Sequence, residues 1–152
     1  MPEHDERRRI PHAPEDVFAL VSDVREYPRF IQWIRAMRVL DDKSTDGVGE
    51  LTAEAIVGYK ILRERFTTKI HLDKPNGVID VSFVSGPFTA LENRWRFHPL
   101  PDGATDVEFH VRYEFANPIL SAILAANFDR AAARIMAAFE ERARAIYPLV
   151  GA

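Results

Sequence analysis

The stretch DVEFHVRYEFANP, residues 106–118, joins a strand pattern directly to a helix start. Its apolar residues occupy every second position, at Val107, Phe109, Val111, Tyr113 and Phe115, and charged residues or histidine fill the positions between them. This period of two is typical of a strand with one dry and one wet face. Asn117 and Pro118 then supply a cap residue and a residue favoured at the first helical position. The stretch therefore predicts a half-buried strand that leads into a helix.

The same alternation recurs upstream and predicts an antiparallel sheet. It is found in five segments, Ile34–Leu40, Glu50–Val57, Leu62–Leu72, Val78–Phe83 and Leu91–Phe97. With a first strand at Arg7–His12, the count is about seven strands. Between the first two strands, Pro14 opens a short helix, and Asp23–Ile31 forms a second one that is interrupted at Pro28.

Downstream, no glycine or proline interrupts the chain between Pro118 and Pro148. One apolar stripe of a long helix would include Leu124, Phe128 and Ile135. Such a helix would be roughly 45 Å long. Since nothing else is large enough to cover the dry face of the sheet, the sequence predicts a single α+β domain, residues 1–152. Its curved antiparallel sheet would surround a long C-terminal helix, and the two short helices would close one side.

The connections between the predicted strands alternate between polar and apolar. The polar ones span residues 41–47, 73–77 and 101–106. The others carry Val57, Tyr59, Phe88, Ile119 and Leu120. Because every second turn of an up-and-down sheet lies at the same end, one end is expected to be apolar. Surface connections are normally polar, so this end needs a cover, a ligand, a membrane or a partner.

Composition narrows the class of protein. The chain has 152 residues, no cysteine and a net charge of -3. These values exclude disulfides and thiol chemistry and indicate no general affinity for DNA. The start has no basic segment followed by an apolar run, and no stretch is apolar enough to span a membrane. We therefore expect a cytoplasmic protein, with peripheral contact to the inner membrane as an open alternative.

No catalytic or metal site is expected. The five histidines lack metal-ligand spacing, and there is no Gly-x-Ser-x-Gly elbow or glycine-rich phosphate loop. The basic run Arg7-Arg8-Arg9 is interpreted as a solvated strand edge, with an anionic lipid headgroup or an RNA phosphate as alternative partners.

Small side chains predict a cavity between sheet and helix. Alanine is frequent on both, as at Ala53 and Ala55 in the sheet and Ala131–Ala133 in the helix. A void lined by Leu, Val and Phe would accept an apolar guest, whereas close approach of helix and sheet is the alternative. Alternation also places Glu64 and Asn93 on the dry face. Each either has a structural partner or binds the polar head of a ligand.

Several stretches match one known family in order along nearly the whole chain. They are Val21–Trp33, Glu50–Tyr59, Glu64–Thr68, Gly86-Pro87-Phe88 with Leu91, Trp95-Arg96-Phe97 and Pro99, then Val107–Phe109, Tyr113–Pro118 and Ala138–Ala143. Together they resemble the coenzyme Q-binding, START-like proteins of the polyketide cyclase/dehydrase superfamily. A departure occurs at Gln32-Trp33, where a pair such as Pro and Cys is common in the family.

The resemblance implies the helix-grip fold and an apolar pocket for ubiquinone, another isoprenoid quinone or a related lipid, in support of respiration. The quinone would be the bound ligand, and no catalytic cofactor is expected. The predicted ligand-binding residues are Leu51, Ala53, Val57, Tyr59, Glu64, Phe66, Phe83, Phe88, Leu91, Asn93, Trp95, Phe109, Tyr113, Leu124, Phe128 and Ile135. The apolar turns at Val57–Tyr59, Phe88 and Ile119–Leu120 would form the mouth.

Two other functions stay open on the sequence. The superfamily also contains a bacterial ribosome-association toxin, which implies a protein that binds the large ribosomal subunit and blocks subunit joining. The central hairpin is more similar to the mitochondrial and alphaproteobacterial quinone-binding members. A cyclase or dehydratase-like enzyme would use Glu64, because burial raises the pKa of a carboxyl group and suits it to acid–base catalysis.

Overall fold

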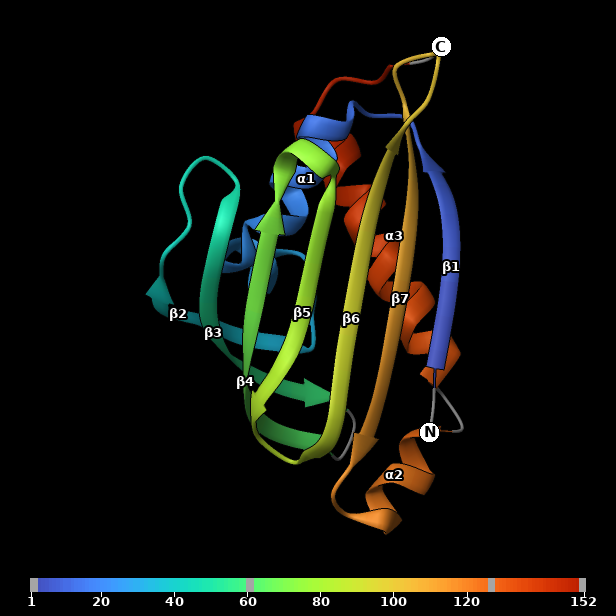
Figure 1. The fold of residues 1–152 in the computed structure, drawn as a ribbon. Helices are drawn as coiled ribbons and strands as arrows, with labels where there is room; N and C mark the ends of the chain where they lie inside the picture. The colour runs from blue at the N-terminus through green and yellow to red at the C-terminus, as the bar shows by residue number, and fades with distance from the viewer. Residues whose placement is uncertain (1–2, 60–61, 126–127, 151–152) are drawn as a thin grey trace.

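The computed structural model describes residues 3–59, 62–125 and 128–150, which form an α+β helix-grip fold. The elements are β1 (Glu3–Ile10), α1 (Pro14–Ser22), η1 (Val24–Arg29), β2 (Ile34–Asp42), β3 (Val48–Tyr59), β4 (Leu62–Asp73), η2 (Lys74–Asn76), β5 (Val78–Ser85), β6 (Phe88–Pro99), β7 (Thr105–Phe115), α2 (Pro118–Ala125) and α3 (Phe128–Ile146). One antiparallel sheet has the strand order β1-β7-β6-β5-β4-β3-β2. It curves around α3, while α1 packs beside that helix (Figure 1). The predicted fold class is therefore confirmed.

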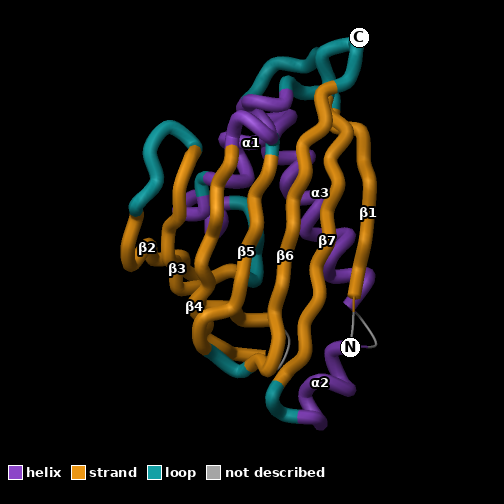
Figure 2. The backbone as a smooth tube through the Cα atoms, in the orientation of Figure 1, coloured by secondary structure: helices purple, strands orange, loops and turns teal. Residues whose placement is uncertain are grey.

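The connections gather at two ends of the sheet, as the alternating turns predict. The β2–β3, β4–β5 and β6–β7 connections lie at one end (Figures 1 and 2). At the other end lie the tips of β3 and β4, the β5–β6 turn and the β7–α2 connection. We call this second group the apolar end. It carries Ile119 and Val84, which are 74% and 51% exposed.

The predicted single helix from residue 118 to residue 147 is wrong. The chain forms two helices, and Figure 1 shows α2 set apart from α3 at the apolar end. Since β7 runs toward this end and α3 runs back along the sheet, the chain has to reverse direction between them. No glycine or proline marks the reversal. The sequence signal within the described residues is Asp129, an acid in the first turn of α3.

Strand β1 begins at Glu3, four residues earlier than predicted. Its half-buried positions hold His4, Glu6 and Arg8, so the apolar alternation that marks a strand is missing. These side chains form polar contacts with one another and with residues of α3. We call this contact between β1 and α3 the seam. His4 bonds to Glu6 and Asp129 at 3.0 and 3.1 Å, and Arg8 lies 3.4 Å from Glu140. Polar pairing here takes the place of apolar packing.

The run Arg7-Arg8-Arg9 is fully paired. Arg7 forms an ion pair with Asp106 and Arg9 with Asp102, while Arg8 contacts Glu6 at 2.7 Å. Because β1 is an edge strand, the interpretation of the run as a solvated strand edge fits the exposed Arg7 and Arg9, whereas the half-buried Arg8 faces Glu140 of α3.

The seam between β1 and α3 gives a testable pH dependence. Burial alone lowers the pKa of His4, but hydrogen bonds and charge attraction from Glu6 and Asp129 outweigh it and raise the pKa above its ordinary 6.5. The imidazolium is therefore bound more tightly in the folded state, and its contribution is complete below pH 6.5. We expect stability to fall as pH rises through the higher folded-state pKa. Urea unfolding of the wild type across this pH range should show this loss of stability, and His4→Gln should show a smaller one. If the stability of His4→Gln depends on pH as that of the wild type does, His4 is not its source.

Gly86 holds the β5–β6 turn against β4. Its φ is +144°, and a Cβ there would lie 2.5 Å from the Cβ of Phe66. We expect Gly86→Ala to lower the free energy of unfolding by about 1–3 kcal/mol, measured by chemical denaturation. Gly58→Ala is the control, because its nearest contact is the movable Arg35 side chain at 3.1 Å. Equal losses in both variants would show that strain at Gly86 is not the cause.

Candidate ligand-binding cavity

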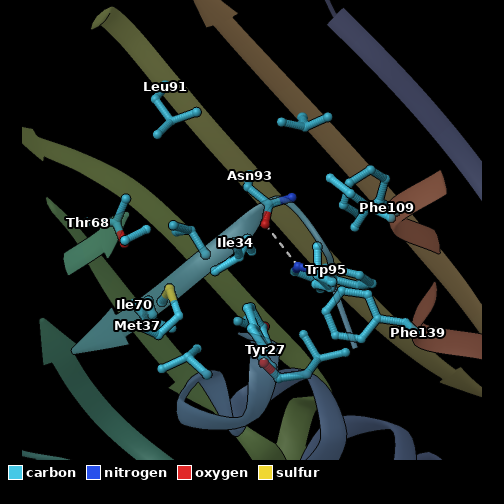
Figure 3. A pocket seen from close by; sticks show the side chains of 18 of the residues that line it. Tyr27, Ile34, Met37, Thr68, Ile70, Leu91, Asn93, Trp95, Phe109 and Phe139 are labelled. Atoms are coloured by element: carbon cyan, nitrogen blue, oxygen red, sulfur yellow. Dashed lines mark hydrogen bonds between the residues drawn. The ribbon is translucent and has the colours of Figure 1, made fainter. Parts of the chain in front are cut away.

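A cavity of about 200 Å³ lies between the concave face of the sheet, η1 and α3. It is lined by Val21, Val24, Tyr27, Ile31, Ile34, Met37, Ala55, Phe66, Thr68, Ile70, Ile79, Val81, Leu91, Asn93, Trp95, Phe109, Val111, Ile135 and Phe139. Figure 1 places α3 behind β6, β7 and β1, and Figure 3 shows the lining side chains converging from sheet and helices. The helix α3 contributes Ile135 and Phe139 to the lining, and residues 21–37 contribute six side chains, so both segments cover the concave face around the cavity.

The walls are almost wholly apolar. Four lining residues carry nitrogen or oxygen in their side chains, Tyr27, Thr68, Asn93 and Trp95, and none of the lining residues is an acid or a base at neutral pH. An apolar cavity of ~150 Å³ stays dry and takes up benzene. The cavity is therefore large enough for a ring-sized apolar guest.

Asn93 is the most polar group on the wall, and its partners are structural. Its Oδ1 accepts a hydrogen bond of 2.9 Å from Trp95 Nε1, drawn in Figure 3. Its Nδ2 donates one of 2.9 Å to the carbonyl oxygen of His110 on β7. A carboxamide carries two N–H donors, so one N–H remains for a guest. Asn93 thus fixes the Trp95 ring and still offers a hydrogen-bond donor.

Two hydroxyl groups behave differently on the wall. The Tyr27 hydroxyl donates to the carbonyl oxygen of Val21, and burial, with a smaller effect from Asp23, raises the pKa of this phenol well above its usual range. The Tyr27 hydroxyl therefore stays protonated, and its hydrogen is already used in the bond to Val21. Thr68 is buried on β4, and its hydroxyl forms no hydrogen bond with the part of the chain that the structure describes. This hydroxyl is a second group that a guest could bond.

An aromatic junction around Phe139 closes the cavity on the side of α3. The Phe139 ring contacts Tyr27 at 5.2 Å, Phe30 at 5.3 Å and Trp95 at 5.1 Å, each edge to face. Edge-to-face pairs at these centroid distances are favourable beyond the area that they bury. The Phe139 side chain therefore links α3 both to the η1 region and to the sheet.

Six of the predicted ligand-binding residues line the cavity: Phe66, Leu91, Asn93, Trp95, Phe109 and Ile135. Leu51 and Ala53 lie elsewhere in the buried core, 5% and 1% exposed. The side chains of Tyr59, Leu124 and Phe128 lie outside the described part of the structure, as does that of Leu120.

Phe83, Phe88 and Tyr113 belong to an aromatic cluster beside the cavity. Phe88 contacts Phe66 at 5.3 Å, Phe83 at 5.8 Å and Tyr113 at 6.3 Å, and it stacks on Phe115 at 4.6 Å. Phe66 belongs both to this cluster and to the cavity wall. Phe88 is therefore packed between the cavity and the apolar end rather than displayed on a rim.

Glu64 and Val57 lie outside the cavity, in a surface groove with Arg35, Arg63 and Arg65. They are cross-strand neighbours at the tips of β3 and β4. The alternation that puts Glu64 on the dry face holds, but here the strands extend past the cavity. Among the described residues no ion pair joins Glu64 to these arginines, and its distance from the cavity separates it from a guest bound there.

Sequence reasoning missed the contribution of the segments around η1 and β2, namely Val21, Val24, Tyr27, Ile31, Ile34 and Met37. A signal was present, because Tyr27 and Ile31 belong to an aromatic and apolar cluster before the sheet. Thr68 was also missed, although alternation places it on the face of Phe66 and Ile70. Only packing reveals which of these apolar residues face an empty space.

The described residues offer neither a metal site nor a membrane-spanning helix. Within residues 3–59, 62–125 and 128–150, no group of three or more His, Cys, Asp or Glu side chains could hold a metal ion. Among the same residues, no helix combines the length and apolar character that crossing a bilayer requires.

Comparison with known proteins agrees with this architecture. Residues 10–140 match the family described as polyketide cyclase / dehydrase and lipid transport. The chain is 31% identical to the ribosome association toxin RatA of Escherichia coli K12 over 147 residues, covering 97% of this chain and 90% of that protein. It is 30% identical to the mitochondrial coenzyme Q-binding protein COQ10 homolog B of Xenopus laevis, covering 95% of this chain and 59% of that protein.

Among solved structures, an 18 kDa protein of Caulobacter crescentus is 43% identical, with a TM-score of 0.79. The similarity covers 96% of this chain and 98% of that one. The curated relatives are thus named as a toxin and a coenzyme Q-binding protein.

Proposed function

Because this chain belongs to the polyketide cyclase / dehydrase and lipid transport family, we propose that its cavity binds the ring of an isoprenoid quinone such as ubiquinone. The protein would act as a quinone chaperone or carrier in support of respiratory electron transport. The likeness to a coenzyme Q-binding protein over 95% of the chain supports this choice among apolar ligands.

The single observation that carries the proposal is the apolar cavity of about 200 Å³ with one amide on its wall. A quinone ring is flat and apolar and has two carbonyl oxygens, which accept hydrogen bonds. The free N–H of Asn93 is a matching donor, and the Thr68 hydroxyl is a second one. Because these two donor groups meet no further partner among the residues that the structure describes, a carbonyl would gain a hydrogen bond without displacing a protein one.

The size of the cavity limits what enters it. A long polyprenyl tail cannot fit in 200 Å³ together with a ring. We propose that the tail leaves past Phe66, which separates the cavity from the Phe88 cluster and the apolar end. Opening this path requires ring movements in the cluster.

Extraction of the native protein tests the proposal. Protein purified from cells that make ubiquinone is extracted with organic solvent, and the extract is analysed by mass spectrometry. Near-stoichiometric quinone is expected. If the extract is empty, the protein is offered a quinone with a single isoprene unit in a detergent-free titration. No binding in both measurements would overturn the proposal.

A second candidate is ribosome association, favoured by the identity to RatA over 97% of the chain. The arginine run at residues 7–9 does not favour it, because each of its side chains is already paired with a carboxylate. Co-sedimentation with isolated large ribosomal subunits tests this candidate. A cyclase or dehydratase step at Glu64 receives no support from the geometry, since Glu64 lies outside the cavity.

A further inference from the structure

A groove of about 440 Å³ on the surface of β2, β3 and β4 gathers three guanidinium groups. It is lined by Arg35, Ile56, Val57, Gly58, Arg63, Glu64 and Arg65, and we call it the arginine groove. All three arginines are exposed, and Glu64 is the one carboxylate among the lining residues. The groove is thus a concentrated positive site on a chain whose net charge is -3.

These arginines are largely unpaired. Neither Arg35 nor Arg63 forms an ion pair or a side-chain hydrogen bond with any residue that the structure describes. Arg65 reaches Glu54 only at 4.0 Å, and Glu54 also lies 3.5 Å from Arg38. Because Gly58 has no side chain, it leaves room for the side chain of Arg35. A Cβ at position 58 would lie 3.1 Å from Arg35 Nε. Two arginines that pair with no described residue, beside a third with only a long contact to a carboxylate, favour an anionic ligand.

The groove continues into the apolar end. A Cβ at Gly86 would lie 3.3 Å from the carbonyl oxygen of Arg65, so the β5–β6 turn packs against the strand that carries two of the arginines. Pro87 in that turn accepts a hydrogen bond of 2.7 Å from the backbone N–H of Ala116, just before α2. Exposed Val84 and Ile119 lie at this end, on β5 and in the first turn of α2, and α2 has no charged residue.

The opposite end of the sheet has the reverse character. Its strand ends and connections carry Asp41, Asp42, Asp46, Asp73 and Asp102, against Lys43 and Lys74, and Asp102 and Asp42 pair with Arg9 and Arg25. Arginines therefore outnumber carboxylates in the groove, whereas aspartates outnumber lysines in the turns at the opposite end.

We propose that the arginine groove and the apolar end together dock onto an anionic phospholipid bilayer. The arginines lie at the level of the lipid phosphates, and Ile119 and Val84 enter the interface. Guanidinium groups bind phosphate oxygens in pairs, and apolar side chains beside a basic cluster are the usual combination at membrane surfaces. Resting on the proposed function, this orientation brings the Phe66 side of the cavity to the membrane that would hold the quinone.

Vesicle co-sedimentation without any quinone tests the docking. The protein is mixed with vesicles of phosphatidylcholine alone or with one third phosphatidylglycerol. Binding is expected to the anionic vesicles and to be lost at high salt. The double variant Arg35→Gln, Arg63→Gln should bind roughly 25-fold more weakly, at about fivefold for each arginine near the surface. The control Arg94→Gln, Arg144→Gln removes two exposed arginines elsewhere and should bind like the wild type.

Depth of insertion gives an independent readout. Ile119→Trp and Leu149→Trp place a new indole at two exposed apolar positions, 74% and 63% exposed, near the apolar end and the opposite end. Brominated lipids should quench the added fluorescence of the first variant alone. Equal quenching of both, or equal loss of binding in the groove and control variants, would overturn the proposed orientation.

The outcomes also separate this proposal from the others. If the wild type fails to bind anionic vesicles but co-sediments with ribosomes through Arg35 and Arg63, the groove binds RNA phosphate and the membrane proposal is wrong. Quinone in the solvent extract of a protein that does not bind vesicles would leave the cavity proposal standing and overturn the docking. Vesicle binding by a protein that takes up no quinone would support the docking and overturn the cavity proposal.

Discussion

Replacing Phe139 by alanine is expected to lower the free energy of unfolding by about 3–5 kcal/mol. The side chain is 3% exposed, and its ring joins α3 to Tyr27 and Phe30 on the η1 side and to Trp95 on β6. The variant loses three edge-to-face contacts and enlarges a cavity that already exists, so the neighbours have little reason to collapse into the space. For a chain of this length, the melting temperature should fall by roughly 10 °C.

Thermal and urea unfolding measure this loss, and Ile146→Ala on the same helix is the control. Ile146 is 46% exposed, so its truncation should change stability by less than about 0.5 kcal/mol. Addition of benzene or indole should restore part of the stability of Phe139→Ala, because the enlarged apolar space can take a ring. A variant as stable as the wild type would contradict the central position of Phe139.

Replacing Ala55 by phenylalanine is expected to weaken quinone binding by roughly 10- to 100-fold while leaving the fold intact. Ala55 lies on the cavity wall between Met37 on β2 and Phe66 on β4, its cross-strand neighbours. The new ring would fill the cavity from β3. A guest would then have to overpack the site at a cost of about 1–3 kcal/mol, which corresponds to this loss of affinity.

The measurement is quinone per protein in the solvent extract, together with the melting temperature. Ala137→Phe adds the same side chain at an exposed position of α3 and should keep the wild-type quinone content. Since Phe139→Ala enlarges the cavity and Ala55→Phe fills it, the two variants should move ligand capacity in opposite directions. Unchanged quinone content in Ala55→Phe, with a normal fold, would place the ligand elsewhere.

Part of this protein could be predicted from local sequence. Alternation at Val107–Phe115 and in the earlier segments determines which face of each strand is dry, because successive strand residues point to opposite sides. It therefore predicted the sheet, the inward direction of Asn93 and Trp95, and the apolar end. Strand reversal at each turn predicted which connections share an end, and turn composition predicted that one of the two ends is apolar.

The tertiary structure alone decided the rest. His4, Glu6 and Arg8 look like a solvated segment until α3 supplies Asp129 and Glu140. Glu64 shares a face with Phe66, and only the length of the strands relative to α3 puts it beyond the cavity. Periodicity fixes the face of a residue, but whether that face meets another side chain, a void or solvent depends on sheet curvature and on contacts between residues far apart in the chain. Close packing makes those contacts depend on volumes that no local pattern encodes.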